Sequence, residues 1–168
     1  MPPAVLIEVL NRYFDAQVPA IARHGGEVLK FIGDAMLAIF PVGEDAAATC
    51  ARALAAAQRA QSALSEENRR RQEAALPRIE YGLALHVGDV MYGNIGSDTR
   101  LDFTVIGPAV NLTARIESMC RELGRQLLLS ADFVSASGIA AHSLGRFSLK
   151  GVGADHEIFA PISPSEPG

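Results

Sequence analysis

The stretch HGGEVLKFIGDAMLAIFP, residues 24–41, decides the fold of this chain. It holds two apolar runs, VLKFI and AMLAIF, that are separated by the pair Gly33-Asp34. Short apolar runs on either side of a glycine-containing corner are typical of a β-hairpin. We therefore predict two antiparallel strands that turn at residues 33 and 34.

Helices are predicted on both sides of this hairpin. Residues 4–23 place apolar side chains at helical spacing, and the glycines that follow His24 suit a helix end. Asp45 can cap a second helix, which runs through an alanine-rich segment to the basic run at residues 69–71. We interpret that basic run as a solvated helix end, where cations suit the helix dipole, rather than as an anion site.

The rest of the chain alternates strands and helices. In chain order we predict strands at 78–87, 90–96 and 101–106, a helix at 108–123, a strand at 126–129, a helix at 130–136, and a hairpin of 144–149 with 157–160. This order predicts an α/β sandwich with a mixed, mostly antiparallel sheet and helices packed on it. We expect one domain over residues 1–162 and a disordered polar tail at 163–168.

Composition and charge exclude several classes of protein. The 168 residues are 49% hydrophobic and 20% charged, which excludes a disordered chain, a coiled coil and a collagen-like protein. A net charge of −4 argues against a general nucleic-acid binder. The chain has no run of about 18 apolar residues, so we expect no membrane-spanning segment in it. Its first residues do not resemble a secretory signal. Cys50 and Cys120 have no metal or redox spacing, so a cytoplasmic location is expected.

Common catalytic motifs do not occur. The chain has no dinucleotide-binding glycine motif, no phosphate-binding loop and no zinc-protease helix motif. The four histidines share no ligand spacing and are interpreted as ordinary turn and strand-edge residues: His24, His86, His142 and His156.

A few positions leave functional and structural interpretations open. Asp34 lies at a corner between apolar strands, where it either forms the turn or serves a site. Lys30 fits the polar face of a half-exposed strand, and Thr104 is an ordinary strand residue by propensity. Asn111 and Arg115 are four residues apart, hence on one helix face, which suits sugar and phosphate oxygens as well as a surface ion pair.

Four blocks together resemble a known family. HGGEVLKFIGDAMLAIFP, LHVGDVMYGNIG, LDFTVIGPAVNLTARIE and FSLKGVG occur in the order found in the catalytic domain of class III nucleotidyl cyclases, the adenylyl and guanylyl cyclases. The resemblance implies the ferredoxin-like-derived fold of that family. It also implies conversion of ATP to cyclic AMP and pyrophosphate, with two Mg²⁺ or Mn²⁺ ions per site.

The resemblance assigns roles to individual residues. Asp34 resembles one of the two carboxylates that hold the metal pair. Lys30 and Thr104 occupy the two places that read the purine, in the pattern of bacterial adenylyl cyclases. Asn111 resembles the residue that orients the ribose, and Arg115 resembles the one that stabilises charge on the α-phosphate.

The terminal turn and the assembly complete this assignment. Lys150, in the KGVG turn, resembles the lysine that binds the β- and γ-phosphates. Family domains pair head to tail, so a homodimer is expected in which each site joins Asp34 of one subunit to the nucleotide-binding residues of the other.

One part of the family pattern is not found. The family domain normally begins with a further strand, FxDIxGFT-like, that carries the second metal carboxylate, and nothing similar precedes Pro3. Three interpretations stay open: a piece of a longer enzyme, a catalytically inactive module that binds nucleotide or dimerises, or a strand restored by exchange between subunits. An unrelated ferredoxin-like ligand-binding domain is a further alternative.

Overall fold

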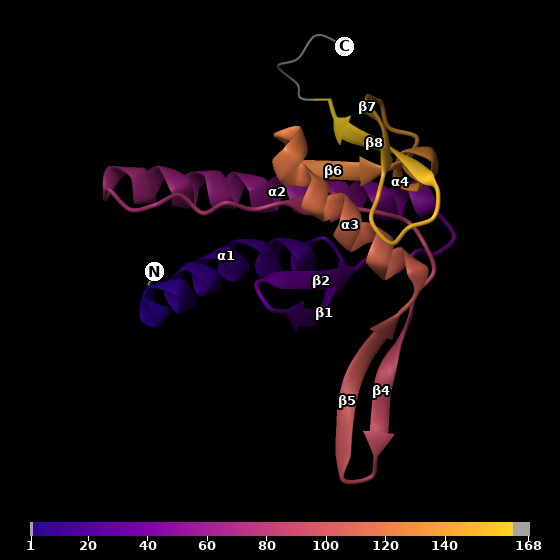
Figure 1. Ribbon diagram of the computed structural model, residues 1–168, viewed down its shortest axis with the longest axis horizontal. Coiled ribbons are helices and arrows are strands. Elements are labelled where there is room, and N and C mark those ends of the chain that lie inside the picture. Colours follow the sequence, from indigo (N-terminus) through magenta and orange to yellow (C-terminus); the bar gives the residue numbers. More distant parts are fainter. Residues whose placement is uncertain (1, 163–168) are drawn as a thin grey trace. The chain divides into compact units, whose positions relative to one another are not determined.

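The computed structural model of the protein describes residues 2–162, except for the side chains of residues 101 and 102. The chain forms two compact units, Met1–Tyr81 and Gly82–Gly168 (Figure 1). The single domain expected over residues 1–162 stays a prediction, and the expected tail at 163–168 lies outside the described residues. Helices combined with mixed, mostly antiparallel sheets confirm the predicted α/β class.

The first unit consists of two helices and a hairpin. Its elements are α1 (Pro3–Arg23), β1 (Glu27–Ile32), β2 (Ala35–Ile39) and α2 (Ala46–Glu73). The hairpin of β1 and β2 turns at residues 33 and 34, as predicted, and Gly33 has a positive φ of 61° that suits a glycine. The predicted cap is also confirmed, because Asp45 Oδ1 accepts the Ala48 N–H at 3.0 Å.

Small side chains form the interface between the helices of this unit. α2 buries a stripe of alanines, and α1 contributes Ala20 and Ile21 to the same interior. Alanine loses no side-chain entropy and allows two helices to approach closely. The buried α2 residues at the core of this stripe are Ala53, Ala56, Ala57, Ala60 and Leu64.

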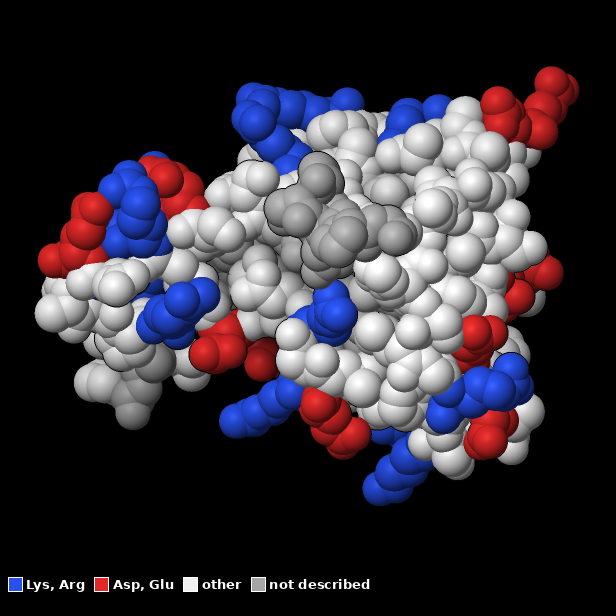
Figure 2. Space-filling model, turned by 90° about the horizontal axis from the view of Figure 1, so that it is seen from above, with Lys and Arg blue, Asp and Glu red and all other residues white. Residues whose placement is uncertain are grey.

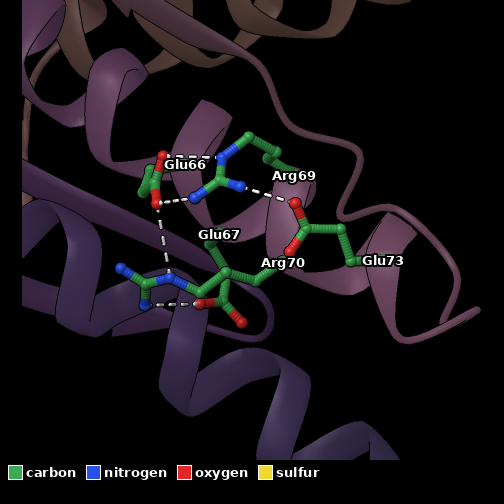
Figure 3. A network of polar contacts seen from close by, with 5 residues as sticks. All are labelled: Glu66, Glu67, Arg69, Arg70 and Glu73. Atoms are coloured by element: carbon green, nitrogen blue, oxygen red, sulfur yellow. Dashed lines mark hydrogen bonds and ion pairs between the residues drawn. The ribbon is translucent and has the colours of Figure 1, made fainter.

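Arginines of the basic run at the end of α2 form ion pairs with glutamates of the same helix. Arg69 pairs with Glu66 and Glu73, with nitrogen–oxygen distances of 2.6 Å to each, and Arg70 lies 3.5 Å from Glu66 (Figure 3). These side chains are exposed, so the pairs contribute little to stability. The run is a helix end, as predicted, although Arg71 is buried and donates from Nε to the Pro77 carbonyl oxygen at 2.6 Å.

The strand predicted at 78–87 is wrong in length, because only Leu83–Leu85 forms β3. The preceding residues are bound to α2 instead. Asn68 Nδ2 donates to the Ile79 carbonyl oxygen at 3.1 Å, and the Ile79 N–H donates to Asn68 Oδ1 at 2.7 Å. A buried side chain that satisfies both backbone groups of Ile79 leaves them no strand partner.

The second unit contains a four-stranded sheet in the order β3-β6-β8-β7. β3 pairs in parallel with β6 (Leu127–Ser130), and β8 (Asp155–Pro161) is antiparallel to both β6 and β7 (Ala141–Ser148). α3 (Pro108–Leu123) packs on this sheet, and α4 (Ala131–Ser137) follows β6. The core that α3 shares with the sheet is formed by Leu112, Ile116, Cys120, Leu128, Leu149 and Ile158.

A hairpin of β4 (Met91–Ser97) and β5 (Arg100–Ile106) belongs to the second unit but forms its own sheet. Figure 1 shows it extending away from the four-stranded sheet of the same unit. Large apolar side chains on it are exposed, among them Met91 at 76% and Ile95 at 55%. β5 leads directly through Gly107 into α3, so the hairpin and this helix are continuous in the chain.

Two surface properties agree with the composition. On the face seen in Figure 2, outside the grey residues, acidic and basic side chains are interspersed and form no broad area of one sign. Among the described residues, none of the helices has the length and apolar character that crossing a membrane requires.

Candidate functional site

α3 presents the candidate residues Asn111 and Arg115. The helix begins at Pro108, whose missing N–H causes no loss in the first turn, and it ends at Gly124 in the left-handed conformation. Leu112 and Ile116 are buried against the sheet. Asn111 and Arg115 are exposed, as the four-residue spacing predicts for one helix face.

These two side chains are not used in holding the fold. Within the part of the chain that the structure describes, neither Asn111 nor Arg115 makes a side-chain hydrogen bond or an ion pair. The surface ion pair that was the structural alternative for Arg115 is therefore not formed among these residues. An amide beside a free guanidinium is suited to sugar hydroxyls and phosphate oxygens.

Lys150 lies in a tight turn of the same unit. The Val152 N–H donates to the Leu149 carbonyl oxygen at 3.1 Å, and Gly151 has a φ of 77°, as in a type II turn. Leu149 is buried in the cluster that also contains Leu112 and Ile116, whereas Lys150 is exposed. The core thus fixes the base of the lysine turn and the inner face of α3 to each other.

Thr104 lies on β5, paired with Gly93 of β4 and half-buried. It comes four residues before α3 begins, so the second unit contains four of the six candidates: Thr104, Asn111, Arg115 and Lys150.

Lys30 and Asp34 both belong to the hairpin of the first unit. A β-bulge between Val28 and Lys30 shifts the register, so that Lys30 pairs with Leu37 and is half-buried. Asp34 is exposed at the turn, and the neighbouring Phe31 and Ile32 are each 52% exposed. An exposed carboxylate with apolar neighbours is free to bind a cation or a partner group.

The described residues do not form a complete metal centre. They include no group of three or more His, Cys, Asp and Glu side chains that could hold a metal ion. Asp34 supplies one carboxylate, whereas hard divalent cations take several oxygen ligands. One carboxylate therefore does not fit the pair of ions that the resemblance implies.

Sequence reasoning missed a polar cluster beside the core of the second unit. His86 follows β3, its side chain is 5% exposed, and its Nδ1 lies 2.8 Å from Ser130 Oγ. A cleft of about 260 Å³ opens next to Ser130, lined also by Arg146 and His156. His86 and Ser130 are 44 residues apart, and no sequence motif links them.

The cysteines contribute no reactive thiol to this unit or the other. Burial raises the pKa of Cys120 to about 12, assisted by the charge of Glu117, while a backbone hydrogen bond of Leu83 acts in the opposite direction. Burial also raises the pKa of Cys50. Thiols that stay protonated at neutral pH are poor nucleophiles and poor metal ligands.

Comparison with known proteins gives the relatives of the chain. The sequence profile of the adenylate and guanylate cyclase catalytic domain matches residues 1–159. An adenylate cyclase of Anabaena cylindrica is 38% identical over 138 residues, which cover 80% of this chain and 26% of that protein. A protein of Mycobacterium tuberculosis is 34% identical over 99% of this chain and 30% of its own length. The chain thus spans less than a third of these relatives.

Solved structures show the same architecture. The guanylyl cyclase Cya2 is 31% identical, with a TM-score of 0.79 over 98% of this chain and 85% of Cya2. The adenylyl cyclase CyaB from P. aeruginosa has a TM-score of 0.81 over 100% of this chain and 88% of CyaB. At 23% identity the second likeness concerns the fold alone.

Proposed function

The chain belongs to the adenylate and guanylate cyclase catalytic domain family, and from this we propose that it is an adenylyl cyclase. It converts ATP to 3′,5′-cyclic AMP and pyrophosphate for cyclic-nucleotide signalling. The observation that carries the proposal is the exposed face of α3, where Asn111 and Arg115 have no side-chain partner among the described residues. The Anabaena relative, which is named an adenylate cyclase, supports the choice of nucleotide.

The reaction requires stabilisation of negative charge and correct positioning of the reacting atoms. The ribose 3′-oxygen forms a bond to the α-phosphorus, and the bond from that phosphorus to the pyrophosphate oxygen breaks. Negative charge grows on the phosphate oxygens, so a positioned cation stabilises the transition state. In our proposal Arg115 supplies that cation, Asn111 orients the ribose, and Lys150 binds the β- and γ-phosphates.

Lys30 and Thr104 are proposed to select adenine. A lysine ammonium donates to the adenine ring nitrogen N1, and a threonine hydroxyl accepts from the 6-amino group. Guanine presents a donor and an acceptor at the corresponding edge, so it calls for the opposite pattern. The double variant Lys30→Glu with Thr104→Cys should shift the ratio of kcat/KM values toward GTP. Unchanged preference for ATP would contradict this assignment.

The second subunit is part of the proposal. We propose a head-to-tail homodimer in which each site combines Asp34 of one subunit with Asn111 and Arg115 of the other. The exposed apolar side chains of the β4–β5 hairpin, including Met91 and Ile95, support an association surface, because large apolar patches on a monomer favour protein contacts. Asp34 is proposed as one ligand to Mg²⁺ or Mn²⁺.

Mixing two inactive variants tests both the activity and the assembly. Asp34→Asn and Arg115→Ala should each lower cyclic AMP formation with Mn²⁺-ATP by about 100-fold or more. In a mixed dimer one site carries both changes and the other carries neither, so a 1:1 mixture should recover about a quarter of the unmodified activity. Recovery shows that each site draws on two subunits, whereas no recovery from two stable variants contradicts the shared site.

The second candidate is a catalytically inactive module of the same fold. It is favoured by the single carboxylate among the residues proposed to bind metal. The unmodified chain would then bind a non-hydrolysable ATP analogue without turning over Mn²⁺-ATP. A cytoplasmic location is proposed for either function, since Cys50 and Cys120 are both buried free thiols.

A further inference from the structure

His86 connects two elements of the second unit that are distant in sequence. Its side chain is almost completely buried, and Nδ1 lies 2.8 Å from Ser130 Oγ. Ser130 is the last residue of β6 and caps α4, since its Oγ accepts the Phe133 N–H at 3.0 Å. The imidazole is therefore attached to the corner where β6 becomes α4.

The hydrogen bonds of Ser130 are compatible with a neutral imidazole. A hydroxyl carries one proton, and Ser130 Oγ already accepts a backbone N–H. Its own proton is available for His86 Nδ1, which accepts it when that nitrogen is unprotonated. A neutral imidazole with its proton on Nε2 fits this arrangement, with Ser130 Oγ as the donor to Nδ1 and no buried charge.

The Nε2 side of the ring and the start of α3 both lie close to Gly88. A methyl group placed on Gly88 would lie 3.0 Å from His86 Nε2 and 2.7 Å from Ala109 Cβ, so all three groups meet with no room to spare. Ala109 is in the first turn of α3, two residues before Asn111. Two residues earlier, a methyl group on Gly107 would lie 2.9 Å from the Asp89 carbonyl oxygen. Residues 86–90 therefore pack against the beginning of α3, and we call this segment the seat of α3.

We infer that His86 is a positioning residue: its neutral imidazole holds the seat at 86–90 between the β6–α4 corner and the first turn of α3. Asn111 and Arg115 extend from that helix. Residues 86–90 therefore determine the positions of these two side chains relative to a bound nucleotide. The inference rests on the proposed function for its catalytic part. The seating of α3 is a property of the fold and is measurable without turnover.

Charged groups around the ring determine its response to pH. Burial lowers the pKa of His86, the Asp132 carboxylate 3.9 Å away opposes this, and His156 adds to it. His156 Nε2 is itself buried without a hydrogen-bond partner in the described part of the chain. The remaining charged groups line the adjacent cleft and come from β7 and β8: Arg146, Asp155 and Glu157.

The sign of the pH effect follows from this lowered pKa. In the folded chain His86 binds its proton less readily than in the unfolded chain, whose histidine pKa is about 6.5. The stability that the neutral form contributes is therefore fully present above about pH 6.5. It is lost as the pH falls from there through the lower pKa of the folded state, and the seat of α3 then loosens.

Hydrogen–deuterium exchange of the full chain tests the seat directly. Amides in the second turn of α3, residues 112–115, donate to carbonyls of the first turn and should exchange faster at about pH 5.5 than at about pH 7.5, after correction for intrinsic rates. His86→Asn keeps an acceptor near the position of Nδ1 but does not titrate, so the acid response should disappear. His86→Leu keeps the volume without an acceptor and should exchange faster at both values. His24→Asn, a histidine of the first unit, should behave like the unmodified chain.

Activity provides the second measurement. The unmodified chain should lose kcat on the acid side, His86→Asn should lose that acid limb, and His86→Leu should lower kcat by about tenfold with little change in KM. An unchanged acid response in the exchange of His86→Asn overturns the inference, and this variant decides the matter if His86→Leu does not fold. If hydrogen–deuterium exchange behaves as expected but the chain does not turn over ATP, the proposed function is contradicted. The inference that residues 86–90 position α3 then remains supported.

Discussion

Replacing Gly88 by alanine tests the link between the seat and the candidate site. Gly88 has no positive φ, so the substitution introduces no backbone strain and acts through its methyl group alone. That group would lie 2.7 Å from Ala109 Cβ, whereas ordinary contact begins at 3.4 Å. The first turn of α3 must therefore move by about 0.7 Å, or the loop at 86–90 must move by the same amount.

The size of the effect follows from this displacement. Overpacking by one methyl group costs about 1–3 kcal/mol of stability in a well-packed site. A misplacement near 1 Å in a catalytic group lowers the rate by up to about 100-fold. We expect Gly88→Ala to lower kcat by about tenfold to 100-fold while the chain remains folded at 25 °C.

Cyclic AMP formation and urea unfolding together provide the assay. Gly43→Ala is the matched control, because no atom lies within 4 Å of a methyl group at that position. The control should keep both its activity and its unfolding midpoint. A Gly88→Ala variant with unmodified kcat would refute the reasoning, because α3 would then not depend on the close contact at Ala109.

The remaining predictions concern a catalytic cation, a buried amide and the proposed dimer surface. Arg115→Ala should lower kcat by about 100- to 1,000-fold, the loss typical of a charge-stabilising donor, and Arg115→Lys should recover only part of it in steady-state kinetics. Asn68→Leu should reduce the free energy of unfolding in urea by about 2–5 kcal/mol, because both backbone groups of Ile79 lose their partner; a change under about 0.5 kcal/mol would exclude that role. Ile95→Asp should lower the mass measured by light scattering toward that of one subunit, and an unchanged mass would exclude β4 from the interface.

Local sequence signals predicted much of the fold. The hairpin at 27–39, the Asp45 cap and the helix from Pro108 to Leu123 each depend on contacts between neighbours in the chain, and the structure confirms all three. The strand at 78–87 was overestimated for the opposite reason. Ile79 binds the side chain of Asn68, and Pro77, just before the predicted strand, binds that of Arg71. A period-2 pattern carries no information about such partners.

Local signals likewise predicted one part of the candidate site and missed another. A four-residue spacing was enough to place Asn111 and Arg115 on one exposed face, since helix geometry alone decides it. The contact between His86 and Ser130 could not be found, because it requires the parallel pairing of β3 with β6, which brings the ends of two distant strands together. Each histidine taken alone resembles an ordinary surface residue.

The isolated β4–β5 pair has a consequence for how rigid the protein is at different concentrations. A lone two-stranded ribbon is marginally stable in water and needs an additional layer to stay ordered. If a neighbouring molecule supplies that layer, amides of residues 91–106 should gain protection as the protein is concentrated. Since Ile106 leads straight into Gly107 and α3, dilution would then loosen α3 from its N-terminal end. The proposed cyclase activity would fall at protein concentrations where the subunits are still folded.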